Sequence, residues 1–147
     1  MKKFFLSMSI VAASMLAIAD PIENSSEKLT TYAANESLKA IYGKVGVVVW
    51  RQAKDNLLRA DFTLDGEKHS AFFEADGRHV ATTVETSLDR LPTAVHKAIT
   101  AKTKGKEMIG LVQYTSETET AYFVEILDGK RKSIFKISPT GTVSRFI

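Results

Sequence analysis

Three short segments of alternating polar and apolar residues, separated by two Asp-Gly pairs, constrain the fold of this chain more than any other feature. The segments lie at 57–64, 67–75 and 78–84, and the pairs are Asp65-Gly66 and Asp76-Gly77. Asp-Gly is the favoured centre of a two-residue type I′ turn, because both central residues adopt positive φ. The sequence therefore predicts three antiparallel strands joined by tight turns.

Two-residue turns also predict the register of these strands. Phe62 is expected opposite His69, and Leu58 opposite Phe73. Phe73 is in turn expected opposite Val80. Because side chains alternate along a strand, Leu58, Phe62 and Phe73 then share one mostly apolar face, which needs a helix or a second sheet over it.

Residues 1–19 have the pattern of a bacterial secretory signal peptide. Lys2 and Lys3 precede an apolar run that ends Ala-Ile-Ala, and cleavage is predicted after Ala19. The run is shorter than the roughly 20 residues that span a bilayer, so no membrane anchor is expected after cleavage. The mature chain is expected in the periplasm or outside the cell. It contains no cysteine, so its core must hold it together without disulfides.

The net charge argues against a nucleic-acid-binding protein. The whole chain has 20 Lys and Arg against 17 Asp and Glu, and without the two leader lysines its net charge is +1. Nucleic-acid-binding domains carry a clear excess of basic residues. The remaining length suits one domain, which we expect to be a monomer.

Residues 20–33 are polar and are interpreted as a linker or a frayed helix start. A short helix is predicted from Ala34 to Tyr42, with Gly43 in the position of a helix C-terminal glycine. The run 44–52 is rich in valine and predicts the first strand.

The second half of the chain shows a similar order of elements. Pro92 is expected at the first position of a helix that extends to about Lys102. Four strands are predicted after it, at 108–115, 120–127, 130–138 and 143–147, with Asp128-Gly129 as the turn between the second and third of them.

The two halves also resemble each other in sequence. The letters L-D-G-x-x-x-S-x-F occur at 64–72 and again 63 residues later, but the apolar faces match at an offset of 64. We follow the offset of 64, because burying a large apolar side chain is worth roughly 1.5–3 kcal/mol, and expect the two turns to differ. This predicts an α+β fold with two tandem helix-plus-four-strand antiparallel repeats, about 34–85 and 86–147, that form one sheet with the helices packed on one face.

Several short motifs follow one another in a characteristic order: Trp50, A-x-F at 60–62, A-x-F-E-x-D-G at 71–77, L-P-x-x-V-x-x-x-I at 91–99 and Y-x-V-x-I at 122–126. Together they resemble the secreted PepSY-like family of Bacteroidetes, whose fold is similar to β-lactamase-inhibitor protein (BLIP). The resemblance covers roughly 34–147, and Thr103 departs from it where the family often has a tyrosine. It implies a non-enzymatic periplasmic or secreted domain that binds or inhibits a protein, and it supplies no catalytic residues.

The residues themselves predict no catalytic or metal site. His69 and His79 are expected on opposite faces of one hairpin, and His96 lies beside the apolar stripe of the second helix. Ser133 and Lys136 spell S-x-x-K, but on a strand they point to opposite faces and cannot act as nucleophile and base. We therefore predict that the chain is not an enzyme and needs no cofactor.

A protein partner is the function that these observations favour. The residues expected to contact it are Trp50, Arg59, Phe72, Lys130, Arg131 and Lys132. Phe72 has the parity of Arg59 and is expected on the outer face, where an aromatic ring among polar groups resembles a small hot spot. For Phe72 and Trp50 packing in the core or at its rim is the more common role, as a solvated surface is for the basic residues, and partner contact is the alternative to both. The alternative function is a small extracytoplasmic ligand carrier or enzyme with a pocket between helix and sheet.

Overall fold

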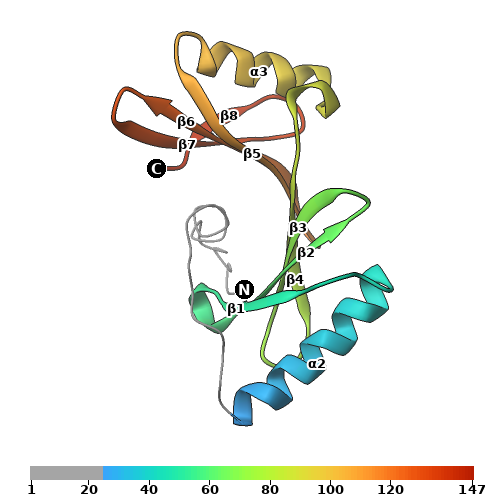
Figure 1. The fold of residues 1–147 in the computed structure, drawn as a ribbon. Helices are drawn as coiled ribbons and strands as arrows, with labels where there is room; N and C mark the ends of the chain where they lie inside the picture. The colour runs from blue at the N-terminus through green and yellow to red at the C-terminus, as the bar shows by residue number, and fades with distance from the viewer. Residues whose placement is uncertain (1–24) are drawn as a thin grey trace.

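The computed structural model describes residues 25–147 and shows an α+β fold (Figure 1). The predicted signal peptide lies outside the described residues. The helices are α2 (Ser25–Tyr42) and α3 (Thr93–Thr103), with short 3₁₀ turns at Lys54–Asn56 and Leu88–Arg90. The strands are β1 (Val49–Gln52), β2 (Leu58–Leu64), β3 (Glu67–Phe73), β4 (His79–Glu85), β5 (Glu107–Ser116), β6 (Thr120–Asp128), β7 (Arg131–Ile137) and β8 (Val143–Arg145).

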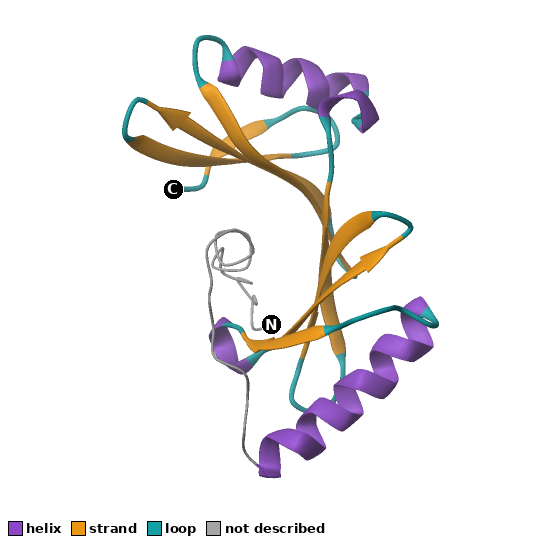
Figure 2. Cartoon of the chain, in the orientation of Figure 1, coloured by secondary structure: helices purple, strands orange, loops and turns teal. Residues whose placement is uncertain are grey.

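The eight strands form one antiparallel sheet, in which each strand pairs with the next along the chain. The sheet is strongly curved, and α2 and α3 lie on its outer, convex side at its two ends (Figures 1 and 2). The pairing of the strands also places both helices on one side. Thr82 of β4 contacts Tyr42 of α2 and pairs with Thr115 of β5. Because side chains alternate along β5, Leu111 points to the same side as Thr115, and Leu111 packs against α3. Both helices therefore cover one face of the sheet.

The β2–β3 hairpin has the predicted register. Phe62 pairs with His69, and Leu58 pairs with Phe73. Asp65 and Gly66 form the two-residue turn with φ of 52° and 80°. The apolar face of this hairpin packs under α2, where Ala34, Leu38 and Phe73 are fully buried.

The β3–β4 connection differs from the prediction. Its loop contains three residues, Ala75–Gly77, closed by a hydrogen bond from the amide of Glu74 to the carbonyl oxygen of Arg78 (2.8 Å). Of the three loop residues only Gly77 has a positive φ, 90°. This is a type I turn followed by a left-handed glycine, which is the common form of a three-residue hairpin loop. The expected two-residue turn centred on Asp76-Gly77 was wrong.

The longer loop shifts the pairing of β4 by one residue. Phe73 pairs with His79 and not with Val80, and a β-bulge absorbs the extra residue before Phe72 pairs with Ala81. Because a one-residue shift reverses the direction of a side chain, the bulge turns His79 toward the convex face. The predicted Phe73–Val80 pair was therefore wrong, because the longer loop and the bulge shift the pairing at this one point.

The hairpins of the second half repeat these pairings 64 residues later. Ile126 pairs with Ser133, as Phe62 pairs with His69, and Tyr122 pairs with Ile137, as Leu58 pairs with Phe73. A three-residue loop recurs at 139–141, closed by the amide of Ser138 and the carbonyl oxygen of Thr142 at 2.9 Å. The offset of 64 in the core pairing is thus confirmed.

The turn between β6 and β7 is displaced by one residue from the expected position. Asp128 pairs with Arg131, so Gly129 and Lys130 are the central residues. The expected Asp128-Gly129 turn was wrong. The displacement accounts for the sequence letters that match at an offset of 63, because Asp65 is a turn residue and Asp128 is the last residue of a strand.

Several element boundaries also differ from their predictions. Helix α2 begins at Ser25, within the predicted linker, and ends at Tyr42 as expected, where the amide of Gly43 donates to the carbonyl oxygen of Lys39 (2.8 Å). Strand β1 begins only at Val49, because the chain must first cross from the end of α2 to the sheet. Pro92 was predicted as the first residue of α3, but the helix begins one residue later, at Thr93.

The concave face has a core of its own around Phe72. Its buried members are Leu57, Phe72, Ala81, Val112, Tyr114, Ala121, Phe123 and Ile134. Phe72 is 0% exposed, although its parity is the predicted one. The curvature of the sheet brings the inner sides of β3 and β4 together with those of β5–β7, and Phe146 packs against the same cluster. The expected exposure of Phe72 was wrong because the uncovered face curves onto itself.

Candidate functional site

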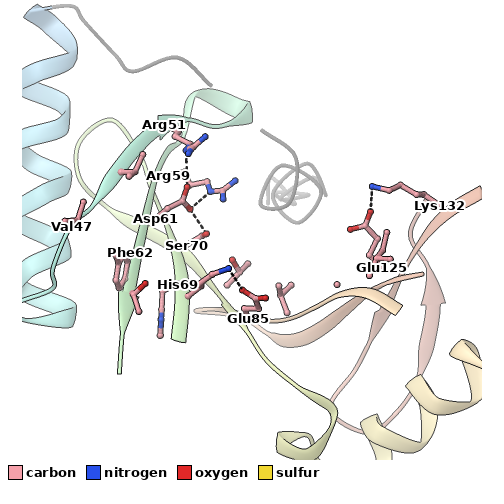
Figure 3. A pocket seen from close by; sticks show the side chains of 17 residues that line it. Val47, Arg51, Arg59, Asp61, Phe62, His69, Ser70, Glu85, Glu125 and Lys132 are labelled. Carbon is pink, nitrogen blue, oxygen red and sulfur yellow. Dashed lines mark hydrogen bonds and ion pairs between the residues drawn. The ribbon is translucent and has the colours of Figure 1, made fainter. Parts of the chain in front are cut away.

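The concave face also contains a cavity of about 1000 Å³ between the two halves of the sheet (Figure 3). Its lining comes from β1 to β7 and from the segment before β1. The charged lining residues are Arg51, Arg59, Asp61, Lys68, Glu85, Glu125 and Lys132. Its aliphatic lining residues are Val47, Val49, Ile109 and Val112. A cavity that combines apolar and fixed polar groups is the default candidate for a binding site.

Asp61 is the centre of a hydrogen-bonded network on one wall of this cavity. Its Oδ1 accepts hydrogen bonds from Arg59 Nε and from Ser70 Oγ, both at 2.6 Å. Its Oδ2 lies 3.2 Å from Arg51 Nε. Alternation puts Arg59 and Asp61 on the same face of β2, and the pairing of Asp61 with Ser70 places the hydroxyl beside the carboxylate. Because the Asp61 carboxylate pairs with the Arg59 guanidinium, burying this positive charge costs less free energy.

Glu125 and Lys132 form an ion pair on the opposite wall (Figure 3). The Lys132 Nζ lies 2.8 Å from the Glu125 Oε1, and the Glu125 side chain is only 6% exposed. Lys68 and Glu85 form a longer pair of 3.6 Å between the two walls, with both side chains largely exposed. Each carboxylate of the cavity is therefore held by a basic neighbour.

The structure separates the six residues that the sequence predicts at a partner surface. Trp50 pairs with Ala60 and faces the convex side, where its ring lies 5.7 Å from that of Phe73. Phe72 and Arg59 are buried on the concave side. Trp50 and Phe72 therefore cannot form one patch, because they lie on opposite faces of the sheet.

The β6–β7 turn keeps its predicted exposure. Lys130, Arg131 and Lys132 are all exposed, and Lys132 also lines the cavity.

The exposed aliphatic residues at the cavity, Val47 and Ile109, were missed by sequence reasoning. Each stands in a β-rich run beside apolar residues that are at least partly buried, such as Val48 and Leu111, so composition does not distinguish them.

His69 and His79 both lie on the convex face, contrary to the prediction of opposite faces, and each lies beside Tyr42. The rings of His69 and His79 are 6.3 Å and 6.4 Å from that of Tyr42. The Tyr42 hydroxyl shares a hydrogen bond with Thr82 Oγ1, which also lies 2.8 Å from His79 Nε2. Burial lowers the pKa of both histidines and raises the pKa of Tyr42. The bulge between β3 and β4 is the cause of this arrangement, because it reverses the direction of His79.

Residues 25–147 contain neither a metal-binding cluster nor a membrane-spanning helix. No group of three or more His, Cys, Asp or Glu side chains in this part of the chain is arranged to hold a metal ion. No helix within it is long and apolar enough to cross a bilayer.

Comparison with known proteins identifies the fold. No protein-family model and no curated protein sequence matches the chain. A BLIP-like protein from Bacteroides fragilis is 25% identical, with a TM-score of 0.67 over 77% of this chain and 82% of that one. A DUF2874 family protein from Bacteroides uniformis is 21% identical, with a TM-score of 0.71 over 77% and 85% of the two chains.

A candidate periplasmic protein from Bacteroides eggerthii is similar to the same extent. It is 20% identical, with a TM-score of 0.70 over 77% of this chain and 86% of that one. The chain therefore has the fold of DUF2874 and BLIP-like proteins of Bacteroides.

Proposed function

We propose that this chain is a non-catalytic module of the periplasm or extracellular space that binds a protein partner, which it inhibits or regulates, through the concave face of its sheet. The observation that carries the proposal is the cavity on that face, which lies on the side away from both helices. The similarity to a candidate periplasmic protein and to a BLIP-like protein supports it. A PepSY-like relationship and cleavage of a signal peptide belong to the same proposal.

The concave face has the composition of a protein interface. Val47 is 86% exposed, Val49 45% and Ile109 36%, and all three line the cavity. Around them lie ion pairs whose side chains are already held in place, such as Arg51 with Asp61. Interfaces combine an apolar centre with a polar rim, and side chains that are ordered before binding lose less entropy when the partner arrives.

The alternative of a ligand carrier or enzyme with a pocket between helix and sheet has less support. Leu38 of α2 and Val95 and Ile99 of α3 are fully buried where these helices contact the sheet. The cavity opens on the opposite face. Within residues 25–147, the space between helices and sheet is therefore packed with side chains.

We also propose that the chain consists of two tandem repeats, about 34–85 and 86–147, and that the cavity lies where their strands meet. The constant spacing of 64 between the paired residues of β2–β3 and β6–β7 supports this. So does the matching contact of each helix with a loop glycine, Gly77 with Ala33 and Gly141 with Ala94.

Capture of partners from a periplasmic extract by the chain from residue 20 tests the proposed function. The cavity variant carries Val47→Gln and Ile109→Gln. The matched control carries Tyr32→Gln and Ile41→Gln, which change two exposed hydrophobic residues of α2 outside the cavity. We expect the wild type and the control to capture the same specific partner and the cavity variant to lose it. Equal capture by all three proteins, or a turnover activity of the purified chain, would contradict the proposal.

A further inference from the structure

Two basic clusters that are distant in sequence meet at one end of the molecule. We call them together the basic tip, and its residues are Lys102, Lys104, Lys106, Lys130, Arg131 and Lys132. Glu107 of β5 pairs with Leu127 of β6, so the loop after α3 lies beside the β6–β7 turn. Lys106 Nζ is 3.4 Å from Asp128 Oδ2, which joins the two loops directly. Both loops lie at the α3 end of the molecule in Figure 1.

The basic tip presents positive charge that nearby carboxylates do not balance. All six of its residues are exposed. Asp128 and Glu125 are already paired, with Lys106 and Lys132 respectively. Within residues 25–147, Lys104, Lys130 and Arg131 form no ion pair. The remaining acidic residue near them is Glu107, which follows Lys106 in the sequence. Lys102 Nζ lies over the Phe135 ring, 5.0 Å from its centroid, which keeps this ammonium group at the surface as well.

The near-neutral charge of the chain conceals a marked asymmetry between its halves. Residues 86–147 contain 10 basic and 6 acidic residues, a net charge of +4. Residues 20–85 contain 8 basic and 11 acidic residues, a net charge of −3. A local cluster of one sign produces a field that attracts an oppositely charged partner even when the total charge is small.

The basic tip is continuous with the cavity, because Lys132 belongs to both. The loops of the tip carry no exposed large hydrophobic side chain among the described residues, whereas Ile109 and Val49 are exposed at the cavity. A lipid surface at the tip would therefore gain charge contacts alone. A protein seated on the concave face would gain apolar contacts in the cavity and charge contacts at the tip.

We propose that the basic tip binds an acidic segment of the protein partner that occupies the concave face. This inference rests on the proposed function and adds the chemistry of the partner to it. The partner carries Asp and Glu residues beside the surface that enters the cavity. Association is accelerated by their attraction to the tip, and binding weakens as salt screens it.

A synthetic peptide rich in Asp and Glu, followed by fluorescence anisotropy, is the probe for this site. The tip variant carries Lys104→Glu and Lys130→Glu. The matched control carries Lys44→Glu and Lys54→Glu, two exposed lysines of the other half that form no ion pair within residues 25–147. Both variants change the net charge equally. We expect the tip variant to bind the peptide about tenfold more weakly, because two exposed ion pairs with the peptide can no longer form, and the control to bind like the wild type. The difference should vanish near 0.5 M salt, where the Debye length is about 4 Å.

Three outcomes would overturn this inference. Equal weakening in both variants would show that total charge and not the tip governs binding. Binding of the wild type to vesicles of anionic phospholipid without binding to the peptide would show that the tip meets a membrane. Equal capture of the protein partner by the tip variant and the wild type would remove the tip from the interface but leave the proposed function standing, since that function is tested separately by the cavity variant.

Discussion

Replacement of Gly77 by alanine tests how closely the β3–β4 loop approaches helix α2. Gly77 has φ of +90°, and a Cβ atom there would lie 2.8 Å from the carbonyl oxygen of Ala33 and 3.1 Å from Ser37 Oγ. Gly66 has a similar φ of +80°, but a Cβ atom on it would meet nothing within 4 Å. The two glycines therefore share the backbone cost of a left-handed residue and differ in the contact with the helix.

The structure sets the size of the two effects. A non-glycine residue in the left-handed region costs roughly 1–2 kcal/mol, and we expect this loss of unfolding free energy for Gly66→Ala. Overpacking adds about 1–3 kcal/mol, because the atom that Gly77→Ala meets is backbone and cannot rotate away. Gly77→Ala should therefore cost about 2–5 kcal/mol, a large part of the 5–15 kcal/mol typical of a domain.

Urea unfolding followed by the fluorescence of Trp50 measures both variants. Trp50 is the single tryptophan and packs beside Phe73, so its emission reports on the sheet under α2. The urea dependence of the unfolding free energy should stay unchanged while the midpoint falls. Equal losses for Gly66→Ala and Gly77→Ala would refute the close contact with Ala33. Gly141→Ala, whose Cβ would lie 2.9 Å from the carbonyl oxygen of Ala94, should behave like Gly77→Ala.

Three further predictions can be measured on the same protein. Phe72→Ala should lower the unfolding free energy by about 3–5 kcal/mol, as truncations of buried phenylalanines do, whereas Tyr32→Ala, at a 65% exposed position, should change it by less than about 1 kcal/mol in urea melts. The unfolding free energy should fall as the pH drops below about 6.5, because burial lowers the pKa of His79 in the folded state and the unfolded chain then binds protons first. Urea melts of His79→Gln across this range should show a smaller loss, and an identical pH profile would contradict the role of His79. Mass spectrometry of exported protein should find cleavage after Ala19, and a mature N-terminus elsewhere would refute that site.

The sequence by itself determined the hairpins and the two helices, because these depend on neighbouring residues. Asp65-Gly66 selects a two-residue turn, and this turn sets the pairing of Phe62 with His69. Alternation then decides which side chains share a face, and the core pairing 64 residues later follows from the same apolar pattern. The end of α2 at Tyr42, just before Gly43, is equally local.

One error of the sequence analysis came from a turn whose type the dipeptide alone does not decide. Asp76-Gly77 closes a three-residue loop in which Gly77 alone has a positive φ, because the loop is held between Glu74 and Arg78 and lies against α2. The resulting bulge moves His79 to the face of His69 and Tyr42. A shift of one residue therefore changed the composition of a whole face.

Only the tertiary structure decided which surfaces are covered and which charges meet. Parity correctly predicts that Phe72 points away from the helices, but its burial depends on the curvature of all eight strands. The same curvature creates the cavity between Asp61 on one wall and Glu125 on the other. The basic tip forms because β5 pairs with β6, which joins residues 102–106 to 130–132. Such contacts join segments far apart in the chain, so alternation and turn chemistry, which act over a few residues, carry no information about them.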